Sequence, residues 1–266
     1  MQPNEPYEAA CRQFVDRILD RSSENRFWAD FLPFQGEISD YGMYNSLSQT
    51  MLKIACTGLP DFYQGSELWD LNLVDPDNRR PVDFEKRTRL LKEVQQLRIS
   101  DFGFRISTSA HNPPSAIRHP QFRDGRAKLF LIYRGLHARG ENREIFDTGD
   151  YLPAVVTGRH AQHVVAFFRV ALARRELGQD AHAMAEASHA LVVAPRFLTS
   201  LIGPGEAPLG EPVWEDTSIR LPRDAPLTWH NVITDETLRA QGEIPVGEVL
   251  ATFPAALLVG RASPLA

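Results

Sequence analysis

The chain has 266 residues, of which 43% are hydrophobic, so it is long enough to bury a substantial core in one large domain or in two domains of ordinary size. Its formal net charge of -5 argues against a nucleic-acid-binding protein, which usually presents a basic face, and against membrane contact through a polybasic segment. A neutral or small polar ligand fits this charge better.

The first residues of the chain carry charges throughout and contain no uninterrupted apolar run. They therefore predict neither a secretory signal nor a transmembrane span, and we expect a cytoplasmic protein. Asn4 precedes apolar residues at steps of three and four, which predicts an amphipathic helix to about Asp20. Further helices are predicted over 26–34 and 41–56.

The next segments alternate between helix and strand. An apolar run at Leu59–Tyr63 predicts a short strand, and Asp83 is a plausible N-cap for a charged helix over 84–98. Residues 100–120 contain prolines and serines with few periodic apolar positions, which predicts a loop or linker. A further helix is predicted over 126–138. Helix, strand, polar loop and helix in this order are typical of an α/β unit.

After Asp147 the chain changes to short apolar or alternating segments that Gly, Pro and Asp turns separate. This pattern predicts a second, antiparallel β-sandwich-like domain, so the expected fold class is α+β. The expected strands are 151–157, 164–169, 190–194, 218–221, 229–232 and 255–259. Residues 171–187 have helix-forming composition, and we interpret them as a helical or mobile insertion.

The cysteines and histidines suggest no metal site. Cys11 and Cys56 are too few for a disulfide framework and lack the spacing of a zinc site. Each lies among apolar positions of an expected helix, which predicts buried free thiols. The histidines show no metal-binding spacing, and His160 and His163 are interpreted as surface residues beside a turn.

The most informative segment is residues 58–83, which read GLPDFYQGSELWDLNLVDPDNRRPVD. Aromatic rings, carboxylates and arginines crowd between glycine turns here, without the periodicity of a core element. A sugar needs such a mixture, because its hydroxyls bind carboxylates and guanidinium groups while its C–H face packs on an aromatic ring. This composition favours an oligosaccharide over a phosphate. Alternatively, Arg79 and Arg80 pair with nearby aspartates and only hold the loop.

Residues 58–87, which read GLPDFYQGSELWDLNLVDPDNRRPVDFEKR, closely resemble the maltooligosyltrehalose synthases of the α-amylase superfamily of glycoside hydrolases. Other segments resemble the C-terminal part of that family in order, namely PNEPYEAACRQFVDRIL, FLPFQGEISDYGMYNSLSQTMLKIACTGLPD, FDTGDYLPAVVTGRHAQHVVAFFR and VWEDTSIRLP. The resemblance covers most of the chain, except 100–121 and 171–187. It implies an isomerase of trehalose biosynthesis that converts the reducing-end α-1,4 bond of a maltooligosaccharide into an α,α-1,1 bond.

The resemblance also implies that catalytic groups are missing. In that superfamily three catalytic carboxylates lie on the fourth, fifth and seventh strands of a (β/α)8 TIM barrel, and this chain begins after them, with Leu59–Tyr63 as the eighth strand. A closed barrel needs about 200 residues or more, and the segment before the β-domain is too short for one. We expect a barrel remnant with a substrate-binding loop over 1–100, a linker and helix over 101–146, and a C-terminal β-domain over 147–266.

The chain is therefore expected to be a fragment that is inactive when isolated. Its expected partners are a maltooligosaccharide and a polypeptide carrying the missing barrel strands, without nucleic acid or membrane. The resemblance gives the loop a substrate-binding or loop-ordering role and places it at the rim of the barrel. The residues that carry this role are Tyr63, Gln64, Glu67, Trp69, Asp75, Asp77, Asn78, Arg79 and Arg80.

We expect no catalytic residue in the chain, although several pairs of loop carboxylates could approach the separation of about 5–5.5 Å that a retaining mechanism needs. Glycosyl transfer through a carboxylate requires neither a metal nor an organic cofactor, so none is expected. Two other functions stay open at this point. One is a non-catalytic carbohydrate-binding or partner-binding protein, and the other is an amylolytic hydrolase of the same superfamily.

Overall fold

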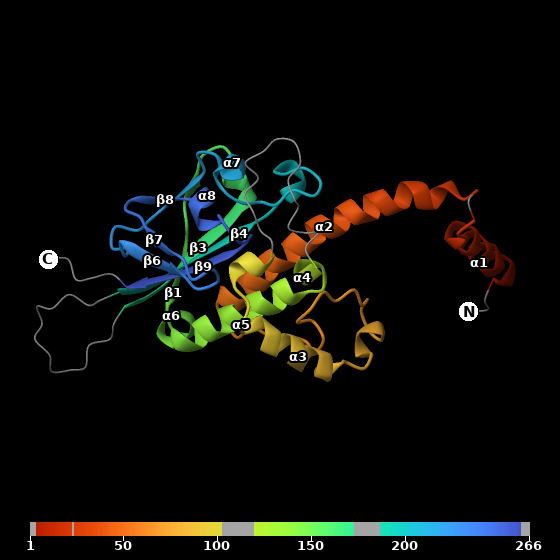
Figure 1. The fold of residues 1–266 in the computed structure, drawn as a ribbon, viewed down its shortest axis with the longest axis horizontal. Helices are drawn as coiled ribbons and strands as arrows, with labels where there is room; N and C mark the ends of the chain where they lie inside the picture. Colours follow the sequence, from red (N-terminus) through yellow and green to blue (C-terminus); the bar gives the residue numbers. More distant parts are fainter. Residues whose placement is uncertain (1–3, 23, 103–119, 173–186, 262–266) are drawn as a thin grey trace, which may run out of the picture. The chain divides into compact units, whose positions relative to one another are not determined.

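The computed structural model describes residues 4–22, 24–102, 120–172 and 187–261 (Figure 1). The chain divides between Gly42 and Met43 into two compact units. Most of the predicted linker at 100–120 and of the predicted insertion at 171–187 lies outside the described residues. In the described part of the chain, no helix is both long enough and apolar enough to cross a membrane.

The described part of the chain is mainly helical up to Asp147 and consists mainly of strands after it, with two short helices, α7 and α8, among the strands. The helices are α1 Glu5–Leu19, α2 Arg26–Ala55, α3 Phe84–Val94, α4 Pro120–Arg123, α5 Arg126–Glu141, α6 Arg143–Asp147, α7 Glu211–Trp214 and α8 Val246–Val249. The strands are β1 Asp150–Pro153, β2 Val156–Thr157, β3 Val164–Leu172, β4 Ala187–Pro195, β5 Ser218–Arg220, β6 Thr228–Asn231, β7 Thr237–Arg239, β8 Glu243–Pro245 and β9 Ala256–Arg261. Short 3-10 helices are η1 Asp77–Arg79, η2 Ile99–Phe102, η4 Ala161–His163 and η5 Leu198–Ser200.

In the first unit, α1 begins where the sequence predicts. The side-chain oxygen of Asn4 accepts a hydrogen bond from the backbone N–H of Tyr7 at 3.3 Å, so Asn4 is the N-cap. Asn25 closes the connection to α2, because its amide donates to three carbonyls of residues 17–20 at 3.1, 2.9 and 2.6 Å. None of the residues of α1 is buried, and the predicted burial of Cys11 is therefore wrong.

The two helices predicted over 26–34 and 41–56 are one continuous helix, α2. The interruption was predicted because residues 35–40 show no apolar stripe. None of these residues is buried, and a helical segment that contacts solvent needs no such stripe. In the second unit, the predicted apolar side of α2 is buried, with Leu47 and Met51 fully inaccessible to solvent.

The other long helices of the second unit also follow from local signals. Asp83 is the N-cap of α3, since its side-chain oxygen accepts a hydrogen bond from the backbone N–H of Lys86 at 2.8 Å. The helix ends at Val94, four residues before the predicted end at Arg98. Helix α5 packs closely on α2, because a Cβ atom at Gly135 would lie only 3.0 Å from Cδ1 of Ile54.

The strand predicted at Leu59–Tyr63 does not form. These residues are neither helix nor strand, and the Leu59 side chain is 90% exposed. A strand needs a neighbour that pairs with its backbone N–H and C=O groups, and none of the strands in the described residues pairs with this segment. An apolar run alone does not supply that neighbour.

The region after Asp147 forms antiparallel sheets, as predicted. The larger sheet has the order β1-β3-β4-β9-β6-β7, and the smaller has the order β2-β5-β8. In the larger sheet, Leu191 of β4 lies opposite Phe168 of β3 and Leu258 of β9. These three residues pack in one hydrophobic core with Ile219 and Ile244 of the smaller sheet. Strands β7 and β8 were not predicted; each has three residues with a single apolar residue at its centre, Leu238 and Ile244.

Among the described residues of this region, His163 and His189 are buried. His163 was interpreted as a surface residue, but it is 3% exposed and its Nδ1 lies 3.2 Å from the carbonyl oxygen of Phe197. His189 of β4 is fully buried, and its ring lies 6.3 Å from the Trp229 ring. Burial lowers the pKa of His189, although the carboxylate of Asp224, 3.8 Å from Nε2, opposes this shift.

Candidate functional site

The central loop, residues 58–83, starts where α2 ends, and a buried arginine of α5 holds this junction. Arg139 donates to the carbonyls of Ile54 at 2.8 Å, Cys56 at 3.4 Å and Gly58 at 2.6 Å. The last carbonyls of a helix lack intrahelical partners and carry partial negative charge, so a guanidinium group satisfies them well. Arg139 itself is only 8% exposed, so a buried side chain holds a junction whose own residues, 57–59, are exposed.

A second arginine, Arg169 of β3, supports the same junction. Its guanidinium donates to the carbonyls of Ala55 at 3.4 Å and Gly149 at 2.7 Å. Burial lowers the pKa of Arg169, and the nearby charge of Arg139 adds to this effect. Burial raises the pKa of the Cys56 thiol, although Arg169 opposes the shift. The loop therefore leaves α2 in a direction that residues distant in sequence determine.

The centre of the loop is fixed to the turn between α4 and α5. Trp69 Nε1 donates to the carbonyl of Phe122 at 2.7 Å, and the two rings pack with their centroids 5.7 Å apart. Lys128 Nζ donates to the carbonyl of Leu68 at 3.2 Å. A Cβ atom at Gly125 would lie 2.9 Å from the backbone nitrogen of Trp69, so only glycine permits this approach. We call these five residues the loop clamp.

Glu67 is held by helix α3 and by the loop backbone. Its Oε2 accepts hydrogen bonds from Arg87 Nε at 2.9 Å and from the backbone N–H of Gly65 at 3.1 Å. Arg87 Nη2 also donates to the carbonyl of Gly65 at 2.8 Å. Beneath these groups, burial lowers the pKa of Lys128, and Lys53 adds to the shift while the loop carboxylates oppose it. These contacts give Glu67 a loop-ordering role.

Two ion pairs between near neighbours organise the tip of the loop. Arg79 Nη2 lies 2.7 Å from Asp75 Oδ2, and Arg80 pairs with Asp77. Asp77 also accepts a hydrogen bond from the backbone N–H of Leu73 at 2.8 Å. Exposed pairs of this kind contribute only about 0–1 kcal/mol each, so their value lies in the geometry that they impose on the loop. The alternative in which the arginines hold the loop agrees with these contacts.

The remaining predicted residues keep groups available. Tyr63 is 49% exposed, and Gln64 is exposed beside it. The amide oxygen of Asn78 is buried and has no hydrogen-bond partner among the described residues. Apolar side chains of the loop are also exposed, with Leu71 at 93% and Val74 at 83%. The loop thus presents an aromatic ring, amide groups and apolar surface, which is a combination suited to a polar ligand with C–H faces.

The structure divides the predicted site residues into two groups. The loop-holding group is Glu67, Trp69, Asp75, Asp77, Arg79 and Arg80, and the group with available atoms is Tyr63, Gln64 and Asn78. No pattern in the sequence indicated Arg87, Lys128 or Arg139, which bind the loop or its start from 20, 60 and 81 residues away. In the part of the chain that the structure describes, no three His, Cys, Asp or Glu side chains are grouped to bind a metal.

Comparisons with known proteins support the resemblance. No protein-family model matches the chain. A protein from two Mycobacterium tuberculosis strains, provisionally named maltooligosyl trehalose synthase, is 29% identical over 257 residues. The match covers 97% of this chain and 25% of the mycobacterial protein.

Solved structures give the same result. Maltooligosyltrehalose synthase from Arthrobacter ramosus has a TM-score of 0.64 at 26% identity, over 97% of this chain and 27% of that chain. A hypothetical maltooligosyl trehalose synthase from Sulfolobus tokodaii shares the fold, with a TM-score of 0.55 at 22% identity over 97% of this chain and 26% of that chain. The resemblance inferred from the sequence is therefore confirmed over nearly the whole chain, which spans about a quarter of the length of these relatives.

Proposed function

We propose that this chain supplies the C-terminal part of a maltooligosyltrehalose synthase, a cytoplasmic enzyme that converts the reducing-end α-1,4 bond of a maltooligosaccharide into an α,α-1,1 bond. The observation that carries this proposal is the similarity of 97% of the chain to proteins named for that activity. Because the match covers only about a quarter of those proteins, the reaction is assigned to a whole enzyme to which this chain contributes one part.

The proposed organisation of this part has three segments. They are a remnant of the catalytic barrel over 1–100, a linker and helix over 101–146, and a β-sandwich-like domain over 147–266. A single hydrophobic core shared by the two antiparallel sheets supports the last of these.

Within the enzyme, we assign to the central loop a direct contact with the oligosaccharide. Tyr63 supplies an exposed ring for the C–H face of a sugar, and the exposed amide of Gln64 supplies hydrogen bonds to its hydroxyls, while the buried amide oxygen of Asn78 has no partner among the described residues. The loop clamp supports this assignment, because a loop already fixed before binding loses little conformational entropy when the ligand arrives. The other predicted residues act indirectly by holding these three in place.

The proposal places the catalytic carboxylates of the reaction outside this chain. Glu67 is bound by Arg87 and by a backbone N–H, while Asp75 and Asp77 are paired with arginines. These contacts favour a role in ordering the loop for the three carboxylates over nucleophilic attack or proton transfer. The isolated chain is therefore expected to be inactive and to need a polypeptide that carries the earlier barrel strands.

A chimeric enzyme tests the proposal. The full chain would replace the matching quarter of the Arthrobacter ramosus synthase, and chromatography would follow the conversion of maltopentaose. The chimera is expected to form a non-reducing product, whereas this chain alone forms none. Release of reducing sugar would instead favour a hydrolase. Turnover by the chain alone that is lost in Glu67→Gln or Asp77→Asn would place the catalytic groups in the loop and refute the proposal.

A pair of tyrosine variants tests the loop assignment within the chimera. Tyr63→Ala should raise KM for maltopentaose about two- to tenfold, which corresponds to the loss of one aromatic contact. Tyr151→Ala removes a tyrosine of similar exposure, 45% against 49%, from strand β1 and should leave KM unchanged. Equal KM values for the two variants would contradict a sugar contact at Tyr63.

A further inference from the structure

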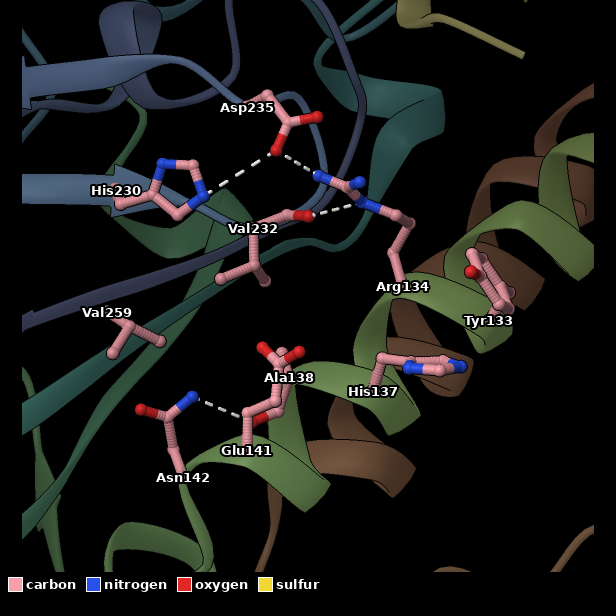
Figure 2. A pocket seen from close by; sticks show the side chains of 10 residues that line it. All are labelled: Tyr133, Arg134, His137, Ala138, Glu141, Asn142, His230, Val232, Asp235 and Val259. Atoms are coloured by element: carbon pink, nitrogen blue, oxygen red, sulfur yellow. Dashed lines mark hydrogen bonds and ion pairs between the residues drawn. The ribbon is translucent and has the colours of Figure 1, made fainter. Parts of the chain in front are cut away.

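A pocket of about 380 Å³ lies between α5 and the strands β6 and β9, and none of its lining residues belongs to the central loop (Figure 2). Arg134, Glu141 and Asn142 line it from α5 and its C-terminal end, whereas His230 and Asp235 line it from β6 and the turn that follows. Ligand pockets in proteins usually have volumes of about 300–1,000 Å³, so this pocket is large enough for a small molecule.

At one end of the pocket, Arg134 of α5 and the polar residues of β6 and the following turn are fixed by mutual contacts. Arg134 Nε donates to the carbonyl of Val232 at 2.7 Å, and its Nη2 pairs with the carboxylate of Asp235. Figure 2 shows Asp235 between Arg134 and His230, whose Nε2 lies 3.6 Å from the same carboxylate. Asp235 has a left-handed backbone with φ +63°, a conformation that is uncommon for residues other than glycine. The backbone thus holds this carboxylate at the rim of the pocket.

The helix side of the pocket has acceptors that are still available. Glu141 is exposed, and its carboxylate has no hydrogen bond or ion pair with the residues that the structure describes. The Nδ2 atom of Asn142 donates to the carbonyl of Ala138 at 2.8 Å, which leaves the amide oxygen of Asn142 as an acceptor. Val232 and Val259 add apolar surface beside these groups. The pocket therefore combines fixed polar groups, an uncompensated carboxylate and a small apolar wall.

The charges in the pocket restrict the class of ligand. Its carboxylates, Glu141 and Asp235, oppose an anion, and the guanidinium of Arg134 already has two partners. The described residues also provide no group of three side chains that could hold a metal ion. A purely apolar molecule would leave the polar lining without hydrogen bonds, which is costly. A neutral molecule with several hydroxyls satisfies the donors and the acceptors together.

We propose that this pocket is a binding site for a neutral polyhydroxylated ligand, such as a glucosyl unit, separate from the central loop. Ligand hydroxyls would donate to Glu141 and Asp235 and accept from His230, while the C–H side of the ligand contacts the valines. This site does not depend on the reaction proposed above, because it requires neither the loop nor the missing polypeptide.

Titration of the full chain with maltose, followed through the ring resonances of His230 by NMR, tests the site. A saturable shift is expected. Glu141→Ala should weaken binding at least about tenfold, since a hydrogen bond to a charged group is lost. Glu144→Ala, which removes an exposed glutamate that does not line the pocket, should leave binding unchanged. The His189 ring is buried 6.3 Å from the Trp229 ring, so its resonance should differ from that of an unfolded chain. This difference serves in each variant as the control that the sheet is folded.

Four results would overturn the proposal. The first is the absence of a saturable shift up to about 100 mM maltose, a concentration a hundredfold above a millimolar Kd. The second is equal weakening by Glu141→Ala and Glu144→Ala. The third is tighter binding of tetramethylammonium or inorganic phosphate than of maltose, which would identify a cation or anion site. The fourth is loss of the His230 shift in Tyr63→Ala, which would place maltose in the central loop alone.

Discussion

The substitution Gly125→Ala should detach the central loop from α5. Gly125 has φ +88°, a left-handed conformation that costs an alanine about 1–2 kcal/mol. The new methyl group would lie 2.9 Å from the backbone nitrogen of Trp69 and 3.1 Å from Cα of Leu68. Backbone atoms cannot move away as a flexible side chain can, so the contact adds an overpacking cost of about 1–3 kcal/mol. The expected loss of stability is therefore about 2–5 kcal/mol.

Gly140→Ala is the control, because Gly140 lies in α5, the helix that Gly125 precedes, and its Cβ would have no atom within 4 Å. Replacing an exposed helical glycine in this way should stabilise the protein by about 0.5–1 kcal/mol. Urea unfolding measures the two changes, and hydrogen exchange of residues 65–80 reports whether the loop loosens. Equal stabilities of the two variants would refute the steric argument. A large loss of stability with unchanged exchange in the loop would show that the clamp does not hold it.

Two further substitutions and one hydrogen-exchange comparison have defined outcomes. In the chimera, Arg79→Lys should lower activity roughly two- to tenfold more than the control Arg143→Lys. Each arginine pairs with an aspartate four residues away, but only Arg79 lies in the central loop. Equal activities of the two variants would contradict this prediction. Burial lowers the pKa of His189, so the unfolded chain takes up the proton first and stability falls as pH drops below about 6.5. Urea unfolding at neutral and acidic pH should show that His189→Leu reduces this fall, and an unchanged fall would exclude His189 as its source. Amides of residues 5–19 should exchange faster than those of residues 187–195, since α1 buries no residue whereas nearly all of β4 is buried; similar rates would be the contrary result.

Local signals in the sequence predicted much of the secondary structure. Asn4 and Asp83 cap the helices that they were expected to cap, because an N-cap needs only a side-chain oxygen and an N–H three residues later. The segment 35–40, in which no residue is buried, hid the continuity of α2, since the prediction relied on apolar periodicity. Leu59–Tyr63 has strand-like composition but no pairing partner among the described strands, and composition alone does not create one.

The sequence indicated a candidate site but not the contacts that organise it. The density of aromatic, acidic and basic residues identified residues 58–83, and the charge pattern suggested that Arg79 and Arg80 pair with aspartates close by. Trp69 was expected to bind substrate or to order the loop, and the contacts of its indole with Phe122 fit the second role. The pocket beside Glu141 had no signal in the sequence, because the residues that line it from the sheet lie about 90 or more residues after those that line it from α5.

The sequence by itself determined the helix caps, the apolar faces, the antiparallel character of the second half and the resemblance to maltooligosyltrehalose synthases. These features depend on residues a few positions apart or on a continuous run of letters. Only the tertiary structure decided that Arg139 and Lys128 hold the central loop, and that Glu67 faces Arg87. Such contacts depend on where the chain returns to itself, and the buried carbonyls and charges that select these partners exist only once the chain has folded around them.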